Sequence, residues 1–352
     1  MLPIPSELAF YQFPCLIGSK LTCLTNHQKN FCKPSMHVGD RSHLKHKIIL
    51  DCDPGHDDAI AILLAARHTE IDLLAITTVA GNQSLEKITR NALKVCSLAG
   101  ILDVPIAMGL DRPLVRPAKP AADIHGESGL DGPHIPEPTI ELARQHAVDL
   151  IIDLLMNSEG DITLVPTGPL TNIAAAMRLQ PSIVPKIKAI SLMGGAMGLG
   201  NVTPAAEFNI HTDPEAAAIV FGCGRPITMV PLEVTHQALA TEDVITRLRS
   251  AQRPVATFAA DLLVFFADTY HKVFGFPAAP VHDPCAVAAV VDPHILQAHS
   301  MHVAIETNGE WTSGRTVCDV YGKLGKEPNA RVGYALEVER FWDMVVGTIL
   351  TY

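Results

Sequence analysis

The sequence has no excess of basic residues, no long apolar run and no C-x-x-C pair. Of its 352 residues, 27 are Lys or Arg and 37 are Asp or Glu, giving a net charge of −10. That charge argues against a nucleic-acid partner, because phosphate backbones are bound mainly through basic side chains. No stretch reaches the eighteen apolar residues of a transmembrane helix, so no membrane partner is expected. Several of the eight cysteines lie in apolar strand or helix patterns, which predicts buried free thiols and a cytoplasmic protein.

The first 46 residues differ in composition from the rest. Basic residues outnumber acidic ones there, and Pro, Ser, Asn and His are scattered without periodicity. The apolar stretch 8–17 is interrupted by polar residues and has no basic residue before it, so it is a poor signal peptide. Three cysteines lie here with a spacing that matches no zinc pattern: Cys15, Cys23 and Cys32. We expect residues 1–46 to be a poorly ordered extension, with Met36 as an alternative start.

From residue 47 onward, short β-rich runs alternate with helical patterns. This alternation predicts one α/β domain over residues 47–352, an open, mostly parallel sheet flanked by helices. The long connection 112–138 is expected to be functional or mobile. The predicted strands are 48–50, 73–80, 104–108, 162–167, 189–193, 227–231, 302–306 and 332–338. The predicted helices are 59–66, 84–98, 146–156, 172–179, 214–221, 285–291 and 340–350.

Four carboxylates lie within the eight-residue segment Asp51-Cys-Asp53-Pro-Gly-His-Asp57-Asp58. Asp51 and Asp53 follow a strand and, being two apart, project to the same side. Asp57 and Asp58 open a helix, where acidic residues usually serve as caps. Capping does not explain the first two, which lie where an open α/β sheet binds its ligands. Converging negative charges require a cation, and carboxylate oxygens favour Ca²⁺ or Mg²⁺ over zinc.

Other polar motifs follow later predicted strands, and parallel strands would gather them beside the acidic segment. Asn82, Asn201, Asn209 and Glu207 are suited to reading vicinal hydroxyls, although a lone Asn is more often a turn residue. His282 is suited to donating a proton to a departing group, with a pKa near neutrality. A cation site, a base, hydroxyl-reading groups and an acid together indicate hydrolytic removal of a leaving group from a sugar.

The acidic segment resembles the signature of the inosine–uridine-preferring nucleoside hydrolases. The resemblance covers the chain from about Lys47 to the end, and seven motifs in the family's order are far more specific than one. It implies a Rossmann-like fold, a homodimer or homotetramer, and an enzyme of nucleoside salvage or catabolism that cleaves ribonucleosides to ribose and free base. The further motifs are Val79-Ala-Gly-Asn82, His125-Gly-Glu-Ser-Gly129, Val165-Pro-Thr167-Gly, Leu192-Met-Gly-Gly195, Ala206-Glu-Phe-Asn209 and Val281-His-Asp-Pro284.

The resemblance also implies roles for individual residues. One Ca²⁺ per subunit would be bound by Asp53, Asp58, the backbone carbonyl of Thr167 and Asp283, with Asp51 supporting the site. Asp53 would also be the general base that activates the metal-bound water, and His282 would assist the leaving base. The residues expected to hold the ribose hydroxyls or to line the pocket are Asp57, Asn82, His125, Met193, Asn201, Glu207, Phe208 and Asn209.

The base-binding side of the pocket is less well defined by the sequence. Tyr270 is a candidate for contact with the base, but its tract 265–271 is equally typical of an amphipathic helix with an aromatic stripe. The choice between purine and pyrimidine therefore stays open, and His125 and His282 favour pyrimidine or broad specificity.

Two other function classes fit parts of the sequence. An Asp-x-Asp pair after a strand also begins the haloacid-dehalogenase phosphatases. The motif of that family has Thr or Val two residues after the second Asp, whereas this chain has Pro-Gly after Asp53. Phosphate release from p-nitrophenyl phosphate with Mg²⁺ would favour that class. A ribose- or Ca²⁺-binding module without turnover would need neither a base nor an acid, so Asp53 and His282 argue against it.

Overall fold

The computed structural model describes residues 45–118 and 125–352, which belong to one compact unit. The predicted extension over residues 1–46, its three cysteines and the alternative start at Met36 fall almost wholly outside these residues. The first strand begins at His46, one residue before the predicted domain boundary. Among the described helices, none is both long and apolar enough to cross a bilayer.

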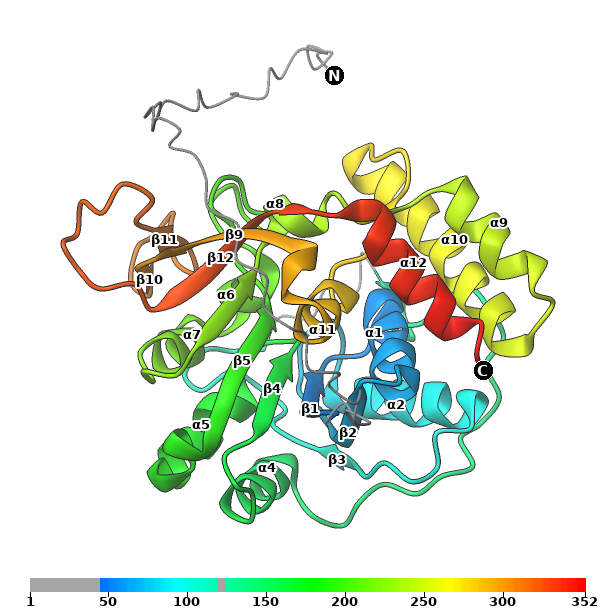
Figure 1. Cartoon of the computed structure of the whole chain (residues 1–352), viewed down its shortest axis with the longest axis horizontal. Helices are drawn as coiled ribbons and strands as arrows, with labels where there is room; N and C mark the ends of the chain where they lie inside the picture. The colour runs from blue at the N-terminus through cyan, green and yellow to red at the C-terminus, as the bar shows by residue number, and fades with distance from the viewer. Residues whose placement is uncertain (1–44, 119–124) are drawn as a thin grey trace, which may run out of the picture. The chain divides into compact units, whose positions relative to one another are not determined.

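An eight-stranded sheet forms the centre of the domain, in the order β3-β2-β1-β4-β5-β6-β12-β9 (Figure 1). Neighbouring strands are parallel throughout, except that β9 pairs antiparallel with β12. The predicted open, mostly parallel sheet is confirmed. The strands are β1 (His46–Cys52), β2 (Ile71–Thr78), β3 (Ile106–Met108), β4 (Ile162–Pro166), β5 (Ile187–Met193), β6 (Ile227–Val230), β9 (Leu296–Met301) and β12 (Ala330–Leu336).

Helices cover both faces of this sheet. Successive residues of a strand point to opposite faces, and in the central strands the residues on both faces are apolar and need to be buried. Ile48 and Leu50 of β1 pack into one core with α1, α2 and α9–α12, whereas Ile49 packs into a second core with α4, α5 and α7. The helices are α1 (His56–Arg67), α2 (Leu85–Ala99), α4 (Ala147–Met156), α5 (Thr171–Leu179), α6 (Phe208–Thr212), α7 (Pro214–Phe221), α8 (Leu232–Thr235), α9 (Glu242–Ser250), α10 (Pro254–Phe274), α11 (Pro284–Val291) and α12 (Val338–Ile349), with 3₁₀ turns η1 (Pro181–Lys186) and η2 (Pro293–Ile295).

Two short antiparallel ribbons lie outside the main sheet. One pairs β7 (Leu239–Ala240) with β8 (Ala279–Pro280), and the other pairs β10 (Val303–Ile305) with β11 (Thr316–Cys318). Figure 1 shows the second ribbon, with its long connecting loop, projecting beside the end of the sheet that carries β9 and β12. The predicted strand 302–306 corresponds to β10, so it exists but does not join the sheet.

Most differences from the predicted elements concern their ends. The helix expected from residue 59 begins at His56, the strand expected from 104 begins at Ile106, and the helix expected from 340 begins at Val338. The edge strand β9 was not predicted, because its sequence LQAHSM carries little apolar alternation and its pairing with β12 is long-range.

The order of strands also fixes where ligands bind. Strand β1 lies between β2 and β4. The strands β2 and β3 are added on one side of β1, and β4, β5 and β6 are added on the other, so the strand order reverses between β1 and β4. Such a switch point opens a crevice beyond the carboxyl ends of the strands. The turn after β1 contains the acidic segment, and the turn after β4 contains Thr167, so both meet at this crevice.

Candidate active site

One cavity of about 410 Å³ brings together nearly all the predicted site residues. Its size is suited to a ligand of nucleoside dimensions. Asp51 and Asp58 are buried close by without lining it. The predicted residues that line the cavity are Asp53, Asp57, Asn82, His125, Thr167, Met193, Asn201, Glu207, Phe208, Asn209, Tyr270, His282 and Asp283.

Asp53 lies in the turn between β1 and α1, enclosed by two neighbouring turns. The backbone N–H of Asn82 donates to its Oδ2 at 2.8 Å. A Cβ at Gly81 would lie 2.1 Å from Oδ2, and one at Gly168 would lie 2.6 Å from Oδ1, so both turns approach the carboxylate as only glycine allows. Burial and the charge of Asp58 raise the pKa of Asp53 well above its usual range. Asp53 is therefore held rigidly and favours binding a proton or a cation.

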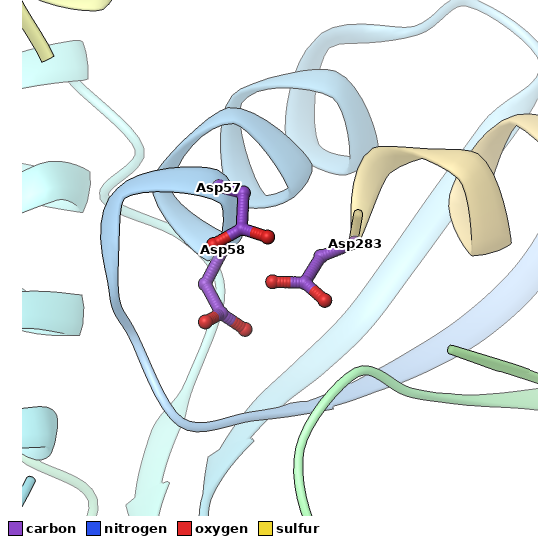
Figure 2. A group of neighbouring side chains, drawn as sticks. All are labelled: Asp57, Asp58 and Asp283. Atoms are coloured by element: carbon purple, nitrogen blue, oxygen red, sulfur yellow. The ribbon is translucent and has the colours of Figure 1, made fainter. Parts of the chain in front are cut away.

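Asp57, Asp58 and Asp283 form a buried cluster at the starts of α1 and α11 (Figure 2). Each offers an oxygen within 4.8 Å of the others, a spacing that suits a shared cation. Burial and the neighbouring carboxylates raise the pKa of Asp283 well above its usual range and that of Asp57 to about 7. Three buried carboxylates without a basic partner in the cluster fit a hard divalent cation such as Ca²⁺, by oxygen donors and by charge. The geometric cluster contains Asp57, whereas the expected ligand set has Asp53.

Thr167 joins this cluster to the opposite wall of the cavity. Its hydroxyl donates to Asp58 Oδ1 at 2.9 Å, and its backbone N–H donates to the carbonyl of Asp51 at 2.8 Å. Its carbonyl oxygen, expected as a metal ligand, accepts a 2.7 Å bond from Asn209 Nδ2. A carbonyl has two lone pairs, so one remains for a cation.

The side chains of Asn82 and Glu207 are hydrogen-bonded to the segments that form the walls of the cavity. Asn82 Nδ2 donates to the carbonyl of Asp53 at 3.0 Å and to Asp58 Oδ2 at 3.4 Å, so it spans the acidic turn. Glu207 caps α6 by accepting from the N–H groups of Asn209 and Ile210, and it also accepts from Gly195 at 2.8 Å. These backbone donors hold the carboxylate in place at the cavity wall.

Asn201 is held at one end only. Its Oδ1 accepts from the Phe208 N–H at 2.9 Å, and among the described residues its Nδ2 has no acceptor. This donor is therefore available to a ligand hydroxyl in the cavity.

Tyr270 and His282 form a hydrogen-bonded pair on the apolar side of the cavity. Tyr270 Oη lies 2.7 Å from His282 Nε2, and Thr235 Oγ1 lies 2.8 Å from Nδ1. Burial lowers the pKa of His282 to about 3, whereas the sequence suggested a value near neutrality. Burial raises the pKa of Tyr270 well above its usual range. The phenol and the neutral imidazole thus share one hydrogen bond, in which either Tyr270 Oη or His282 Nε2 is the donor.

His125 is buried in a stack of aromatic rings. Its Nδ1 lies 3.2 Å from His56 Nδ1, and its ring centroid lies 5.4 Å from that of Phe266. The acceptor at the far side of His56 is the carbonyl of Asp131, 2.8 Å from Nε2, so Nε2 carries the proton of that ring. Burial lowers the pKa of both imidazoles, which keeps the stack neutral.

Asp51 lies behind the acidic turn, among residues for which the sequence predicted no role. Its Oδ1 accepts from Thr77 at 2.6 Å and from Asn172 Nδ2 at 2.8 Å. Asn172 also accepts from the Leu110 N–H, so it ties together the turns after three strands. Asn172 stands in the motif after β4, but its contact with Asp51 crosses 121 residues of sequence, which no local pattern could indicate.

Four apolar side chains that the sequence patterns did not assign to the site also line the cavity. Val273 and Phe274 end α10, Phe266 lies two turns earlier on the same helix, and Val202 comes from the loop after β5. The signal for Phe266 and Phe274 was their four-residue spacing from Tyr270 on one helix face, which is equally expected of a core stripe.

Known proteins match this chain over most of its length. The family model described as "inosine-uridine preferring nucleoside hydrolase" matches residues 48–343. The pyrimidine-specific ribonucleoside hydrolases RihB of Escherichia coli and Escherichia fergusonii are 49% identical over 308 residues, covering 88% of this chain and 98% of each relative. Among solved structures, a purine-preferring ribonucleoside hydrolase from Gardnerella vaginalis superposes with a TM-score of 0.82 at 35% identity, covering 87% of this chain and 98% of that one.

A plant nucleoside hydrolase superposes with a TM-score of 0.81 at 31% identity, covering 87% of this chain and 99% of that one. The family model, the relatives and the solved structures therefore agree on the family, and each match covers most of the chain. The chain belongs to the inosine–uridine-preferring nucleoside hydrolase family, and it is a hydrolase of N-glycosyl bonds.

Proposed function

We propose that this enzyme carries out calcium-dependent hydrolysis of the N-glycosidic bond of ribonucleosides, with a preference for pyrimidines. The observation that carries the proposal is one cavity that joins the buried acidic cluster to the Tyr270–His282 pair. A nucleoside has a polar sugar and a flat base, which correspond to the acidic and the apolar sides of this cavity.

Asp53 is the proposed general base. The close turns at Gly81 and Gly168 keep its carboxylate in one orientation at the cavity wall, where it can accept a proton from the attacking water. We assign Ca²⁺ binding to Asp53, Asp58, the Thr167 carbonyl and Asp283, and when bound the cation would supply positive charge that lowers the pKa of that water. Asp51, with Thr77 and Asn172, would support this turn from behind.

The ribose hydroxyls are assigned to Asp57, Asn201, Glu207 and Asn209. Asn201 Nδ2 supplies a donor, and the carboxylates of Asp57 and Glu207 supply acceptors already oriented by backbone N–H groups. Holding the sugar by several groups orients C1′ towards the water. The surrounding carboxylates then stabilise the positive charge that develops on the sugar as the C–N bond breaks.

The departing base is assigned to the apolar side of the cavity. As the C–N bond breaks, negative charge develops on the base and a proton must reach it. The Tyr270–His282 pair lies at this side and can offer the departing base a hydrogen bond, and the raised pKa of Tyr270 and the lowered pKa of His282 keep both groups neutral until the base gains negative charge. Phe266, Phe274 and His125 offer ring faces on which a base can stack.

The pyrimidine preference is supported by the relatives. The bacterial enzymes named pyrimidine-specific are 49% identical to this chain, whereas the solved enzyme named purine-preferring is 35% identical. We further propose a homodimer or homotetramer, as the family resemblance implies, and a cytoplasmic location in nucleoside catabolism. Buried free thiols at Cys52, Cys96 and Cys285 are consistent with a reducing compartment.

A nucleoside panel tests the proposal. Uridine, cytidine, inosine, adenosine and deoxyuridine are assayed for release of the free base, with and without a Ca²⁺ chelator. We expect kcat/KM to be highest for uridine and cytidine, far lower for deoxyuridine, and abolished by chelation. Comparable kcat/KM values for uridine and deoxyuridine would contradict the role given to the ribose hydroxyls.

The variant Asp53→Asn separates chemistry from folding. It keeps the size of the side chain and removes the base, so kcat should fall by about 10²–10⁴-fold while the cooperative unfolding transition is kept. The matched control is Asp103→Asn, which changes an exposed carboxylate far from the cavity. Undiminished turnover in Asp53→Asn would remove Asp53 from its assigned role.

A further inference from the structure

The loop that carries Asn201 into the cavity is short of contacts with the core of the domain. It runs from Gly194 to Ala206 between β5 and α6, and its middle is solvent-facing, with Leu199 75% and Val202 44% exposed. Beyond residue 198 it is held mainly to itself, through bonds from the N–H groups of Gly200 and Val202 to Pro204 and Ala206. The position of Asn201 therefore depends on both ends of the loop: on residues 204–208, to which Asn201 and its neighbours are bonded, and on how residues 196–198 are fixed.

Three side chains from elsewhere in the chain hold the backbone of residues 196–198. Glu233 of α8 accepts from the Met197 N–H at 3.0 Å and from the Gly198 N–H at 2.9 Å, one bond to each carboxylate oxygen. Arg315 donates to the carbonyls of the same two residues, at 3.3 and 3.2 Å. The two peptides are thus held from both their donor and their acceptor sides by charged groups, which make stronger bonds than neutral ones.

Thr316 of β11 holds the preceding residue in the same way. Its Oγ1 accepts from the Ala196 N–H at 2.9 Å and donates to the Ala196 carbonyl at 2.6 Å. Gly195, at φ +81°, lies directly against Thr316, where a Cβ would be 2.8 Å from Cγ2. We call Glu233, Arg315 and Thr316 the loop clamp.

The ribbon β10–β11, which supplies two of these residues, is itself attached to the other ribose-side segment. The carbonyl of Ser313 lies 3.0 Å from His211 Nδ1 of α6, the helix that carries Asn209. Arg116 binds Ser313 Oγ at 2.8 Å and forms a two-pronged ion pair with Glu215 of α7. The ribbon therefore contacts both the loop that carries Asn201 and the helix that carries Asn209.

We propose that Glu233, Arg315 and Thr316 are positioning residues for the substrate, which act by fixing where Asn201 lies. The inference rests on the proposed function, because it takes Asn201 to bind the ribose. None of the three lines the cavity, so their effect on the substrate passes through the loop. Loosening the clamp weakens substrate binding and leaves the acidic cluster and the Tyr270–His282 pair in place.

The decisive variant is Glu233→Gln, which keeps the shape of the side chain but offers only one acceptor oxygen to the two N–H groups. We expect the KM for uridine to rise about tenfold with kcat changed less than about threefold. Hydrogen exchange should speed up in a peptide covering residues 196–203. The matched control is Glu310→Gln, an exposed carboxylate in the loop of the same ribbon, for which KM and exchange stay at the parent values.

A double-mutant cycle with Asn201→Ala tests the route of the effect. In the Asn201→Ala background, Glu233→Gln should change KM less than about twofold, because the group that it positions is gone. An unchanged KM in the single variant, or the same rise in both backgrounds, would overturn the inference. Thr316→Val and Thr316→Ser give a second pair, in which Val raises KM and Ser restores it, should Glu233→Gln fail to fold. A parent enzyme that hydrolyses no nucleoside would overturn the proposed function instead, while the exchange of residues 196–203 in the variants would still test the clamp.

Discussion

At the scale of single residues, the buried carboxylates behave differently according to their partners. Asp53, Asp57 and Asp283 lie where several carboxylates repel one another, and their raised pKa values reflect this as well as burial. Asp51 lies behind them and is influenced chiefly by burial, which raises its pKa to about 7, offset in part by its bonds from Asn172 and Thr77. Its other oxygen, Oδ2, has no partner among the described residues. The two donated bonds are therefore what keeps a charged Asp51 tolerable in the interior.

Thr77→Val tests this account through the pH dependence of stability. The Thr77 bond lowers the pKa of Asp51, so its loss raises that pKa further above the unfolded value. A raised carboxyl pKa gives stability that is present at low pH and lost as pH rises through the folded pKa. We therefore expect Thr77→Val to cost about 1 kcal/mol at pH 5.5 and about 2–3 kcal/mol at pH 8.5, from urea unfolding. Thr77→Ser keeps the hydroxyl and should lose much less at either pH; a cost independent of pH would contradict the model.

At the scale of elements, the sequence predicts the strand–turn–helix units well. β1, β4 and β5 contain apolar runs that give way to polar or glycine-rich turns, and the first turns of the helices α1 and α5 contain the polar pairs Asp57-Asp58 and Thr171-Asn172. These signals are local, so strands and helices could be predicted with errors of two or three residues at their ends. The motifs at the turns could be assigned to one edge because parallel strands share their direction.

The contacts between those units could not be predicted in the same way. Asn172 reaches Asp51 across 121 residues, and Thr316 reaches Ala196 across 120. A lone Asn or Thr has no sequence pattern that distinguishes such a bond from a surface turn. The edge strand β9 and the strand β11 were not predicted for a related reason, since antiparallel pairing of short, half-exposed strands leaves only weak alternation.

Asp213 illustrates what such a hidden contact does for an element. It caps α7 through the Ala216 N–H at 3.0 Å with one oxygen. The other oxygen accepts from the Leu114 N–H and from Thr171 Oγ1, both at 2.8 Å. One fully buried carboxylate thus joins the helices α5 and α7 to the connection after β3.

Asp213→Asn should therefore cost more stability than the loss of a cap. The amide oxygen can keep the bond to Ala216, but the amide nitrogen then faces two donors, and their hydrogen bonds are lost. We expect about 2–4 kcal/mol of destabilisation in urea unfolding, against no more than about 1 kcal/mol for Glu242→Gln in the exposed first turn of α9. A loss of similar size in both variants would show that the bonds to Leu114 and Thr171 contribute little.

At the scale of the whole molecule, the fold concentrates negative charge at one point of an already acidic protein. The chain carries a net charge of −10, and Asp51, Asp53, Asp57, Asp58 and Asp283 are all buried near the switch point of the sheet. Burying like charges together opposes folding unless they are protonated or a cation is bound. The same arrangement that would serve catalysis is thus a cost to stability that a bound cation would offset.

Calcium should consequently stabilise the whole domain and not only support turnover. A ligand that binds the folded state alone raises the free energy of unfolding by about 2.7 kcal/mol at a hundred times its dissociation constant. We expect the Tm of chelator-treated protein to rise by several degrees as Ca²⁺ is added, saturating at the concentration that restores uridine hydrolysis. In Asp283→Asn the rise should be much smaller, whereas Asp319→Asn, a change in the turn directly after β11, should keep it. If the Tm did not change with Ca²⁺ concentration while hydrolysis still required Ca²⁺, the result would contradict binding in the acidic cluster. It would indicate that the cation binds together with the substrate.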